Sequence, residues 1–234
     1  MALSDHLGCI VTGMDHGGTT FTLNLLKAHP NLFSGFECGL LFEPGVARRK
    51  YSKFIKKGWQ IKDKKAIDQI SQVPTNYAFQ LLFNHSKLKK PDSKIIDKTP
   101  GYSEYWSTFL KSSEDVPIIV VKKNPYDQFC SWRKRGHKIN EFVHIYNRRL
   151  VSPLKKLTPE QRKRVLVVDF SMLFTDPRLY VQNMLNHIGF PFDESVYTDA
   201  FFDSMIDQRK KIDYQKILPG RDIGIINTKI VRYM

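Results

Sequence analysis

Short apolar runs, each bounded by turn residues, recur along the chain. Four of them are rich in Ile and Val and do not alternate between apolar and polar positions: residues 8–13, 94–97, 117–121 and 165–170. A strand that is buried on both faces has this pattern, because both sides of its backbone meet apolar neighbours. The four runs therefore predict four strands of a parallel sheet.

Segments with helical periodicity lie between the predicted strands. Residues 19–28 carry apolar side chains in helical phase. A second helix is expected after Asp176-Pro177, because Asp is a good N-cap and Pro suits the first turn, and Gly189 ends it. Strands that alternate with helices indicate an α/β fold, in which helices flank a parallel sheet on both faces to give three layers.

The chain has 234 residues, of which 41% are hydrophobic and 26% are charged. This composition is typical of a globular protein and excludes collagenous and disordered chains. We expect residues 1–234 to form a single domain. No apolar run approaches the ~18 residues of a membrane helix, and the first residues do not resemble a signal peptide. The three cysteines show no CxxC spacing, so we expect neither a disulfide nor a zinc site, and a cytoplasmic location.

The formal net charge of +14 is concentrated in three segments. Residues 48–65, 122–138 and 148–164 have net charges of +8, +5 and +6, and the rest of the chain is acidic on balance. Such an excess suggests a polyanionic partner, although solvated helix faces carry similar charges. We interpret the third segment as surface. The first belongs to residues 40–90, which we interpret as a helical insertion covering the carboxyl ends of the strands, where open α/β sheets bind ligands.

The first predicted strand runs into a glycine turn and a helix start, Gly17-Gly18-Thr19-Thr20. Backbone N–H groups and a helix N-terminus that converge in this way suit a phosphate group. In the nucleotide-triphosphate loop GxxxxGK[ST] a Lys would stand where this chain has Thr19. The strand at 117–121 is also followed by Lys122-Lys123, not by an acidic residue that would hold magnesium. The turn is thus suited to phosphate but poorly suited to Mg-ATP.

Several motifs, in order along the chain, resemble those of sulfotransferases that use 3′-phosphoadenosine 5′-phosphosulfate (PAPS). They are Gly13-x-x-His16-Gly17-Gly18-Thr19-Thr20 with His29-Pro30, Asp97-Lys98-Thr99-Pro100-x-Tyr102, Lys123-Asn124-Pro125-x-Asp127 with Ser131, the segment from residue 165 to Pro191, and the tail Gly220-Arg221 with Asn227, Arg232 and Tyr233. The resemblance implies a P-loop-like fold, PAPS as donor, adenosine 3′,5′-bisphosphate (PAP) as product, and no metal.

The same resemblance implies roles for individual residues. The 5′-phosphosulfate would bind to the loop formed by Asp15, His16, Gly17, Gly18, Thr19 and Thr20, and the 3′-phosphate to Lys123, Ser131 and Arg221. Family members usually have Lys or Arg at the position of His16 and Arg at the position of Lys123. We expect His16, charged beside a dianionic ligand, and Lys98 to face the leaving oxygen. In the alternative, His16 is neutral and Lys98 alone supplies the charge.

The acceptor hydroxyl or amine needs a base, and Glu37 resembles the family's catalytic glutamate in position. Glu43 is the alternative, since Phe42-Glu43-Pro44 could also approach the cleft. We expect the acceptor to be a small molecule or a carbohydrate, with an anionic acceptor suggested by the basic residues of 40–90. The rings of Trp59, Trp106 and Trp132 could line its pocket, although core packing is their commoner role.

Two other functions fit parts of the sequence. The first is a P-loop nucleotide kinase or hydrolase, which the Thr at position 19 disfavours. The second is a non-catalytic anion- or nucleic-acid-binding protein on a sulfotransferase scaffold, which Tyr51, Phe54 and Trp59 within the basic segment would suit. No nucleic-acid-binding motif is present, so we expect no nucleic-acid partner. We also expect no association with a membrane, since no apolar run is long enough to cross one. The oligomeric state stays open.

Overall fold

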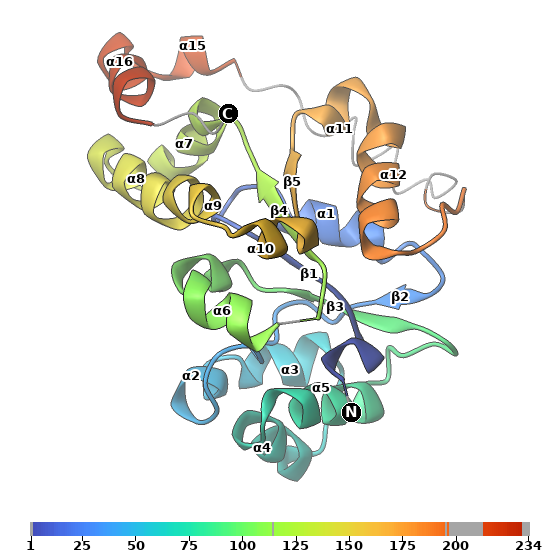
Figure 1. Cartoon of the computed structure of the whole chain (residues 1–234). Helices are drawn as coiled ribbons and strands as arrows, with labels where there is room; N and C mark the ends of the chain where they lie inside the picture. Colours follow the sequence, from blue (N-terminus) through green and yellow to red (C-terminus); the bar gives the residue numbers. More distant parts are fainter. Residues whose placement is uncertain (1, 114, 195, 197–212, 231–234) are drawn as a thin grey trace.

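A computed structural model describes residues 2–113, 115–194, 196 and 213–230. Its centre is a five-stranded sheet in the order β2-β3-β1-β4-β5, and every neighbouring pair is parallel (Figure 1). The strands are β1 (Leu7–Gly13), β2 (Leu32–Phe33), β3 (Lys94–Lys98), β4 (Ile118–Lys122) and β5 (Val165–Asp169). The four strands predicted from apolar runs are confirmed within one or two residues. Two residues are too few to give a pattern, so β2 was not predicted.

Helices connect the strands and cover the sheet. They are α1 (Thr19–Leu26), α2 (Val46–Arg49), α3 (Ser52–Gly58), α4 (Lys64–Gln72), α5 (Thr75–His85), α6 (Trp106–Ser112), α7 (Pro125–Arg133), α8 (Ile139–Tyr146), α9 (Ser152–Lys155), α10 (Pro159–Arg164), α11 (Met172–Thr175), α12 (Pro177–Ile188), α15 (Tyr214–Ile217) and α16 (Gly220–Lys229). Both predicted helices are present. The Asp176 carboxylate caps α12 by accepting from Leu179 N–H, and Gly189 follows with a φ of 75°.

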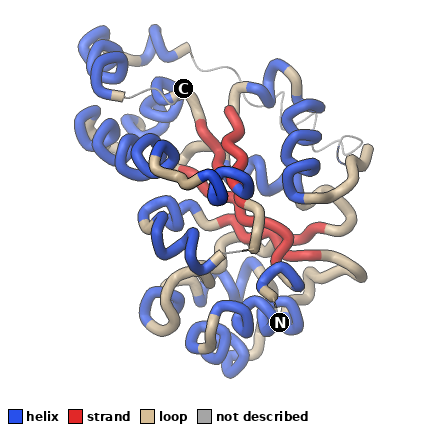
Figure 2. The backbone as a smooth tube through the Cα atoms, viewed as in Figure 1, coloured by secondary structure: helices blue, strands red, loops and turns tan. Residues whose placement is uncertain are grey.

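The sheet separates two apolar clusters, which confirms the predicted three layers (Figure 2). On one face, strand residues such as Val11 and Ile96 pack with apolar residues of α1 and α12. On the other face, Ile10 and Ile118 share a cluster with apolar residues of α3–α8. Both faces are apolar because successive side chains of a strand point to opposite sides. The carboxyl edge of the sheet is left for polar side chains.

The segment between β2 and β3 is helical, as expected, and consists of α2, α3, α4 and α5. We expected this segment to cover the carboxyl ends of the strands. Part of it lies at the opposite end of the sheet, because α5 contacts the 3₁₀ turn Leu3–Asp5 at the amino end of β1. Arg48 of α2 is fully buried and donates to the carbonyl oxygens of Phe42 and Val73, each at 2.7 Å. One charge of the basic segment therefore serves internal packing. That residues 1–234 form one domain stays a prediction.

Candidate active site

The glycine turn after β1 leaves the N-terminus of α1 open to a ligand. Gly18 is the N-cap residue of α1, its φ is 99°, and no side chain caps the helix. A Cβ atom at this position would lie 2.5 Å from the ring of Phe170, so only glycine fits. The first N–H groups of a helix have no partner within it, and the helix dipole is positive there. This end of α1 is suited to an anion.

A cavity of about 250 Å³ lies at this helix end. Its lining residues are His16, Gly18, Thr19, Thr20, Phe21, Lys123, Ser131 and Arg135. Six of the eight were predicted from sequence as binding residues, and they come from two segments more than a hundred positions apart. The lining combines hydroxyl groups with an imidazole, an ammonium and a guanidinium group. This set of donors fits the phosphate groups of a nucleotide.

Phe21 and Arg135 were not predicted as part of the site. Arg135 lies just after the end of α7, where its guanidinium donates to the carbonyl oxygen of Ser131 at 2.7 Å. Its position four residues after Ser131 is the signal that could have indicated it, because such residues lie on one side of a helix. Phe21 was expected only as an apolar core residue of the first helix.

Asp15 belongs to residues 15–20, which we call the phosphate loop after their predicted ligand, and anchors this loop from outside the cavity. Its carboxylate accepts from the guanidinium of Arg149 at 2.9 Å, and its carbonyl oxygen accepts from Gln128 Nε2 at 2.8 Å and Trp132 Nε1 at 3.1 Å. Arg149 also pairs with Glu104 at 3.1 Å. These contacts hold the loop against α7 and the turn Asn147–Val151, so the structure assigns Asp15 a positioning contact rather than a place in the cavity lining.

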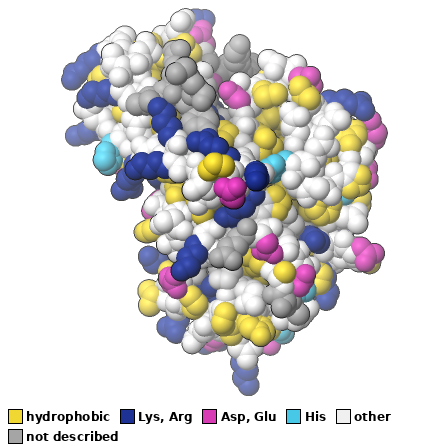
Figure 3. Space-filling view, viewed as in Figure 1, with side chains coloured by type: hydrophobic (Ala, Val, Ile, Leu, Met, Phe, Trp, Pro, Cys, Tyr) yellow, Lys and Arg dark blue, Asp and Glu magenta, His cyan; other side chains and the backbone are white. Residues whose placement is uncertain are grey.

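The buried position of Arg149 corrects the interpretation of the third basic segment as surface. Only 4% of its side chain is exposed. Arg164, at the end of the same segment, donates to the carbonyl oxygens of Leu110 and Ser113. The other five Lys and Arg residues of residues 148–164 are exposed, and Figure 3 shows basic side chains gathered over α8, α9 and α10. Sequence reasoning assigned one role to a segment whose members have two.

His16 has a backbone φ of 61°, which is unusual for a residue with a side chain. Burial lowers the pKa of its imidazole, the positive charges of Arg135 and Lys123 lower it further, and Asp15 opposes the shift. The pKa of His16 is thus held below the 6.5 of an unperturbed imidazole, which favours its neutral form near pH 7. A bound dianion would favour the protonated form, so which of the two forms acts in catalysis stays a prediction.

Glu37 and Lys98 form an ion pair at the carboxyl end of β3. The distance from Lys98 Nζ to Glu37 Oε1 is 2.8 Å. The side chain of Lys98 is 1% exposed and that of Glu37 is 20% exposed. The ammonium group also lies 3.5 Å from the ring centroid of Phe36, whose φ of 94° is in the left-handed region. Burial lowers the pKa of Lys98, and Glu37 partly offsets this. The structure brings together two of the three predicted catalytic residues.

A buried hydrogen-bond network fastens the loop that carries Glu37. The Asp97 carboxylate accepts from Tyr102 Oη at 2.5 Å and from Thr99 Oγ1 at 2.8 Å. Thr99 Oγ1 accepts from Gly39 N–H at 3.3 Å, and Tyr102 Oη accepts from Leu41 N–H at 3.1 Å. Burial raises the pKa of Asp97, while the bonds from Tyr102 and Thr99 oppose the rise. The motif Asp97-Lys98-Thr99-Pro100-x-Tyr102 therefore positions Glu37 as well as Lys98.

The remaining candidates lie elsewhere. Arg221 is exposed on α16, and among the described residues it does not line the cavity of His16; Arg232 and Tyr233 lie outside the described residues. Glu43 is exposed and lines a different cavity. The three Trp rings are buried, which agrees with a role in core packing. Trp132 supports the phosphate loop, and Trp106 donates to the carbonyl oxygen of Arg149.

No helix in the described part of the chain combines the length and the apolar character that crossing a membrane requires. Cys9, Cys38 and Cys130 are buried free thiols. Burial raises the pKa of each thiol, and the negative charge of Asp97 adds to the rise at Cys9 and Cys38. Such thiols are unreactive, so the cysteines contribute to packing.

Comparisons with known proteins agree with the motifs. The fold is similar to that of a sulfotransferase domain from the Synechococcus PCC 7002 olefin synthase, with a TM-score of 0.59, 20% identity, and coverage of 94% of this chain and 93% of that one. A sulfotransferase domain from the curacin biosynthetic pathway gives 0.54 at 15% identity, covering 97% and 93%. Mouse sulfotransferase SULT7A1 complexed with PAP gives 0.53 at 9% identity, covering 96% and 85%.

A comparison with curated protein sequences returned no match. At these identities, the structural likenesses establish the fold alone, namely the P-loop-like α/β architecture that the sequence predicted. The sequence profile described as "Sulfotransferase family" matches residues 9–194, which includes the phosphate loop, Glu37, Lys98, Lys123 and Ser131. On this match, the chain belongs to the sulfotransferase family.

Proposed function

We propose that this chain transfers a sulfonate group from PAPS to a hydroxyl or amine group of a small-molecule acceptor. The observation that carries the proposal is the cavity at the N-terminus of α1, where two distant segments contribute hydroxyl groups and three nitrogen-based donors. The ion pair of Glu37 and Lys98 lies at the end of the neighbouring strand β3, and the carboxylate of Asp15 acts on the pKa of Lys98. The proposed phosphate site and the proposed acid–base pair thus lie at one edge of the sheet.

The binding residues divide between the two ends of the donor. The hydroxyl groups of Thr19 and Thr20, with the N–H groups at the start of α1, would hold the 5′-phosphosulfate. Lys123 and Ser131 would hold the 3′-phosphate. Arg135 would add a second cation there, which offsets the lack of a bidentate Arg at position 123. Arg221 stays a proposed contact whose position on α16 gives it no support.

The donor supplies an activated sulfonate, and the protein supplies position and charge. Glu37 accepts the proton of the acceptor hydroxyl as its oxygen forms the new bond to sulfur. The bond between sulfur and the 5′-phosphate oxygen breaks, and Lys98 and His16 stabilise the negative charge on that oxygen. Groups that are already in place when charge develops usually contribute most to the rate of such reactions.

The contact between Glu37 and Lys98 has a consequence for this mechanism. Lys98 Nζ donates to Glu37 Oε1 at 2.8 Å, so this hydrogen bond occupies the oxygen that would otherwise accept the proton of the acceptor. An anionic sulfonate competes with Glu37 for Lys98, so donor binding would free the carboxylate for proton abstraction.

We also propose a cytoplasmic location, supported by the three buried free thiols.

Transfer of ³⁵S-labelled sulfonate from PAPS to a panel of phenols, sterols, amines and sugars tests the proposal. We expect labelled product with at least one acceptor class, and none from Glu37→Gln, which should still bind PAP. Transfer of phosphate from Mg-ATP to any acceptor, with no sulfonate transfer, would show a kinase instead. Binding of PAP or single-stranded nucleic acid without any turnover would favour the non-catalytic alternative.

A further inference from the structure

A second cavity of about 380 Å³ lies between α2 and the segment that follows β3. Aromatic side chains form much of its lining, namely Phe42, Tyr51 and Tyr105. The volume is within the range of about 300–1,000 Å³ that is typical of small-molecule pockets. Its walls come from the part of the chain expected to select the acceptor, and from residues 101–108, which directly follow Lys98, Thr99 and Pro100.

An aromatic row connects this cavity with the ion pair of Glu37 and Lys98. The ring contacts run from Tyr105 to Phe42 (5.8 Å between centroids), Tyr51 (5.6 Å), Phe54 (6.1 Å) and Phe36 (5.9 Å). Phe36 carries the ammonium of Lys98 over its face. None of the five rings is fully buried, and Tyr105 is 56% exposed. A solvent-facing row of rings is more than core packing requires, because core rings are usually covered.

Tyr51 links the cavity with the loop that carries Glu37. It lines the cavity, and its ring packs so closely on Gly39 that no room is left for a Cβ atom there. Burial raises the pKa of Tyr51, and the negative charge of Glu37 adds to the rise. An acceptor held against Tyr51 would therefore lie next to the loop that carries Glu37, since Gly39 is two residues from the carboxylate that would take its proton.

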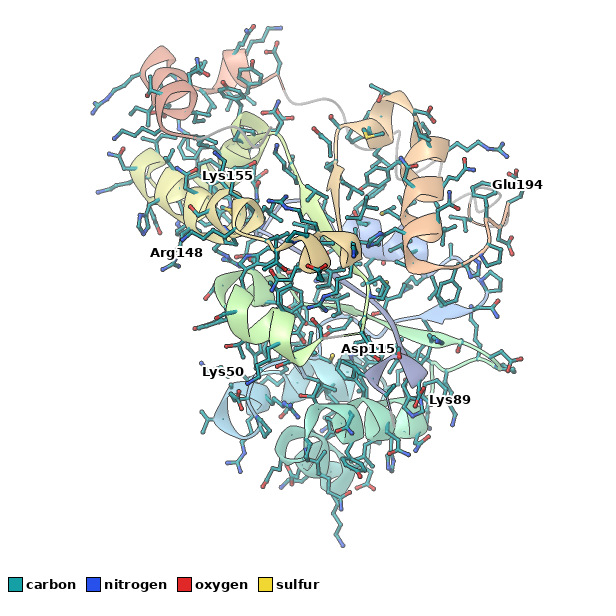
Figure 4. The ribbon with its side chains drawn as sticks, viewed as in Figure 1. Lys50, Lys89, Asp115, Arg148, Lys155 and Glu194 are labelled. Atoms are coloured by element: carbon teal, nitrogen blue, oxygen red, sulfur yellow. The ribbon has the colours of Figure 1, made fainter. Side chains whose placement is uncertain are left out.

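The charges of the cavity do not favour an anion. Lys50, labelled in Figure 4 beside α2, is the one residue of the basic segment 48–65 with a charged side chain among those that line it in the described structure. Glu43 and Glu104 line it as well. Arg48 is buried with its own hydrogen bonds, and the other basic residues of the segment are exposed at other surfaces. The +8 segment thus contributes one positive charge to a cavity with two carboxylates, of which Glu104 pairs with Arg149 at 3.1 Å and Glu43 is exposed.

We propose that this cavity and aromatic row are the acceptor site, and that the acceptor is an uncharged aromatic alcohol whose ring stacks on Tyr105, Phe42 and Tyr51. The proposal rests on the proposed function and replaces the expectation of an anionic carbohydrate. Aromatic rings hold flat partners by stacking and edge contacts, while the lining has no excess of positive charge to hold an acid. The hydroxyl group reaches Glu37, and the body of the molecule stays in the cavity.

Steady-state transfer from PAPS to 2-naphthol, compared with a glucuronic-acid disaccharide, tests the acceptor class. We expect kcat/KM for 2-naphthol to exceed that for the disaccharide at least tenfold. Tyr105→Ala should raise the KM for 2-naphthol roughly 3- to 10-fold, given the usual strength of one aromatic contact. Thr108→Trp, which places a large ring in the cavity, should lower kcat/KM more than tenfold. Tyr77→Ala is the matched control, because Tyr77 is 55% exposed on α5, away from the cavity.

Calorimetric titration with PAP separates a failure of this inference from a failure of the proposed function. If all variants bind PAP as the unmodified chain does and the disaccharide is the better acceptor, the aromatic-acceptor proposal is overturned while sulfonate transfer stands. The proposal is also overturned if 2-naphthol is sulfonated equally by the Thr108→Trp and Tyr77→Ala variants. If the unmodified chain binds no PAP and sulfonates neither compound, the proposed function itself fails.

Discussion

The ion pair between Glu37 and Lys98 can be tested through the folding stability of the protein. Lys98 is 1% exposed and its ammonium lies 2.8 Å from the Glu37 carboxylate, so Glu37→Gln leaves a buried positive charge without its counter-ion. Removing one partner of a buried pair costs about 3–5 kcal/mol. We expect roughly 2–3 kcal/mol here, since Glu37 keeps some contact with water and Gln retains a neutral acceptor.

A double-mutant cycle isolates the pair from the rest of the site. Lys98→Met removes the charge and keeps an apolar side chain for the ring of Phe36. For a chain of this size, Glu37→Gln should lower Tm by roughly 4–12 °C, measured by thermal unfolding with circular dichroism. The variant that carries both changes should lose much less than the sum of the two single losses. Additivity within about 0.5 kcal/mol would show that the pair does not form.

Three further predictions concern the phosphate loop. Burial and neighbouring cations lower the pKa of His16, and a bound dianion would raise it again, so PAP affinity should rise as the pH falls through neutrality and level off below the lowered pKa of the unliganded chain. His16→Gln should reduce this slope in calorimetry, and identical slopes would contradict the role of His16. Gly18→Ala, which places a Cβ against Phe170, should abolish PAP binding, and retained affinity would refute the strained-cap geometry. Arg149→Met should weaken PAP binding severalfold and lower Tm, whereas an unchanged affinity would show that the loop needs no support from this residue.

The sequence predicted the elements that have a local signal. Apolar runs identified four strands, and Asp176, Pro177 and Gly189 identified both ends of α12, because capping and burial patterns are properties of neighbouring residues. The glycine turn was recognisable from its own residues, whereas Lys123 and Ser131 were assigned through the resemblance to sulfotransferase motifs. The structure lines one cavity with both segments. Their roles in catalysis remain predictions that the experiments above address.

What the sequence could not show depends on which side chains turn inward. Arg149 and Arg48 belong to basic segments whose pattern is that of solvated surface, yet each is buried with its hydrogen bonds satisfied by distant residues. Arg135 lines the cavity at the N-terminus of α1 because of the direction of the chain after α7. The aromatic row likewise joins rings that are far apart in the sequence, such as Phe42, Phe54 and Tyr105. Tertiary packing, which has no local pattern, decides each case.

The affinity for PAP tests the central claim most directly. We expect calorimetric titration to show PAP binding at least tenfold more tightly than 5′-AMP, since only PAP carries the 3′-phosphate that Lys123 and Ser131 would hold. Lys123→Met should bring the two affinities within about threefold. If PAP binds no better than 5′-AMP, or if Mg-ATP binds more tightly than PAP, the chain does not use this cavity for the sulfonate donor.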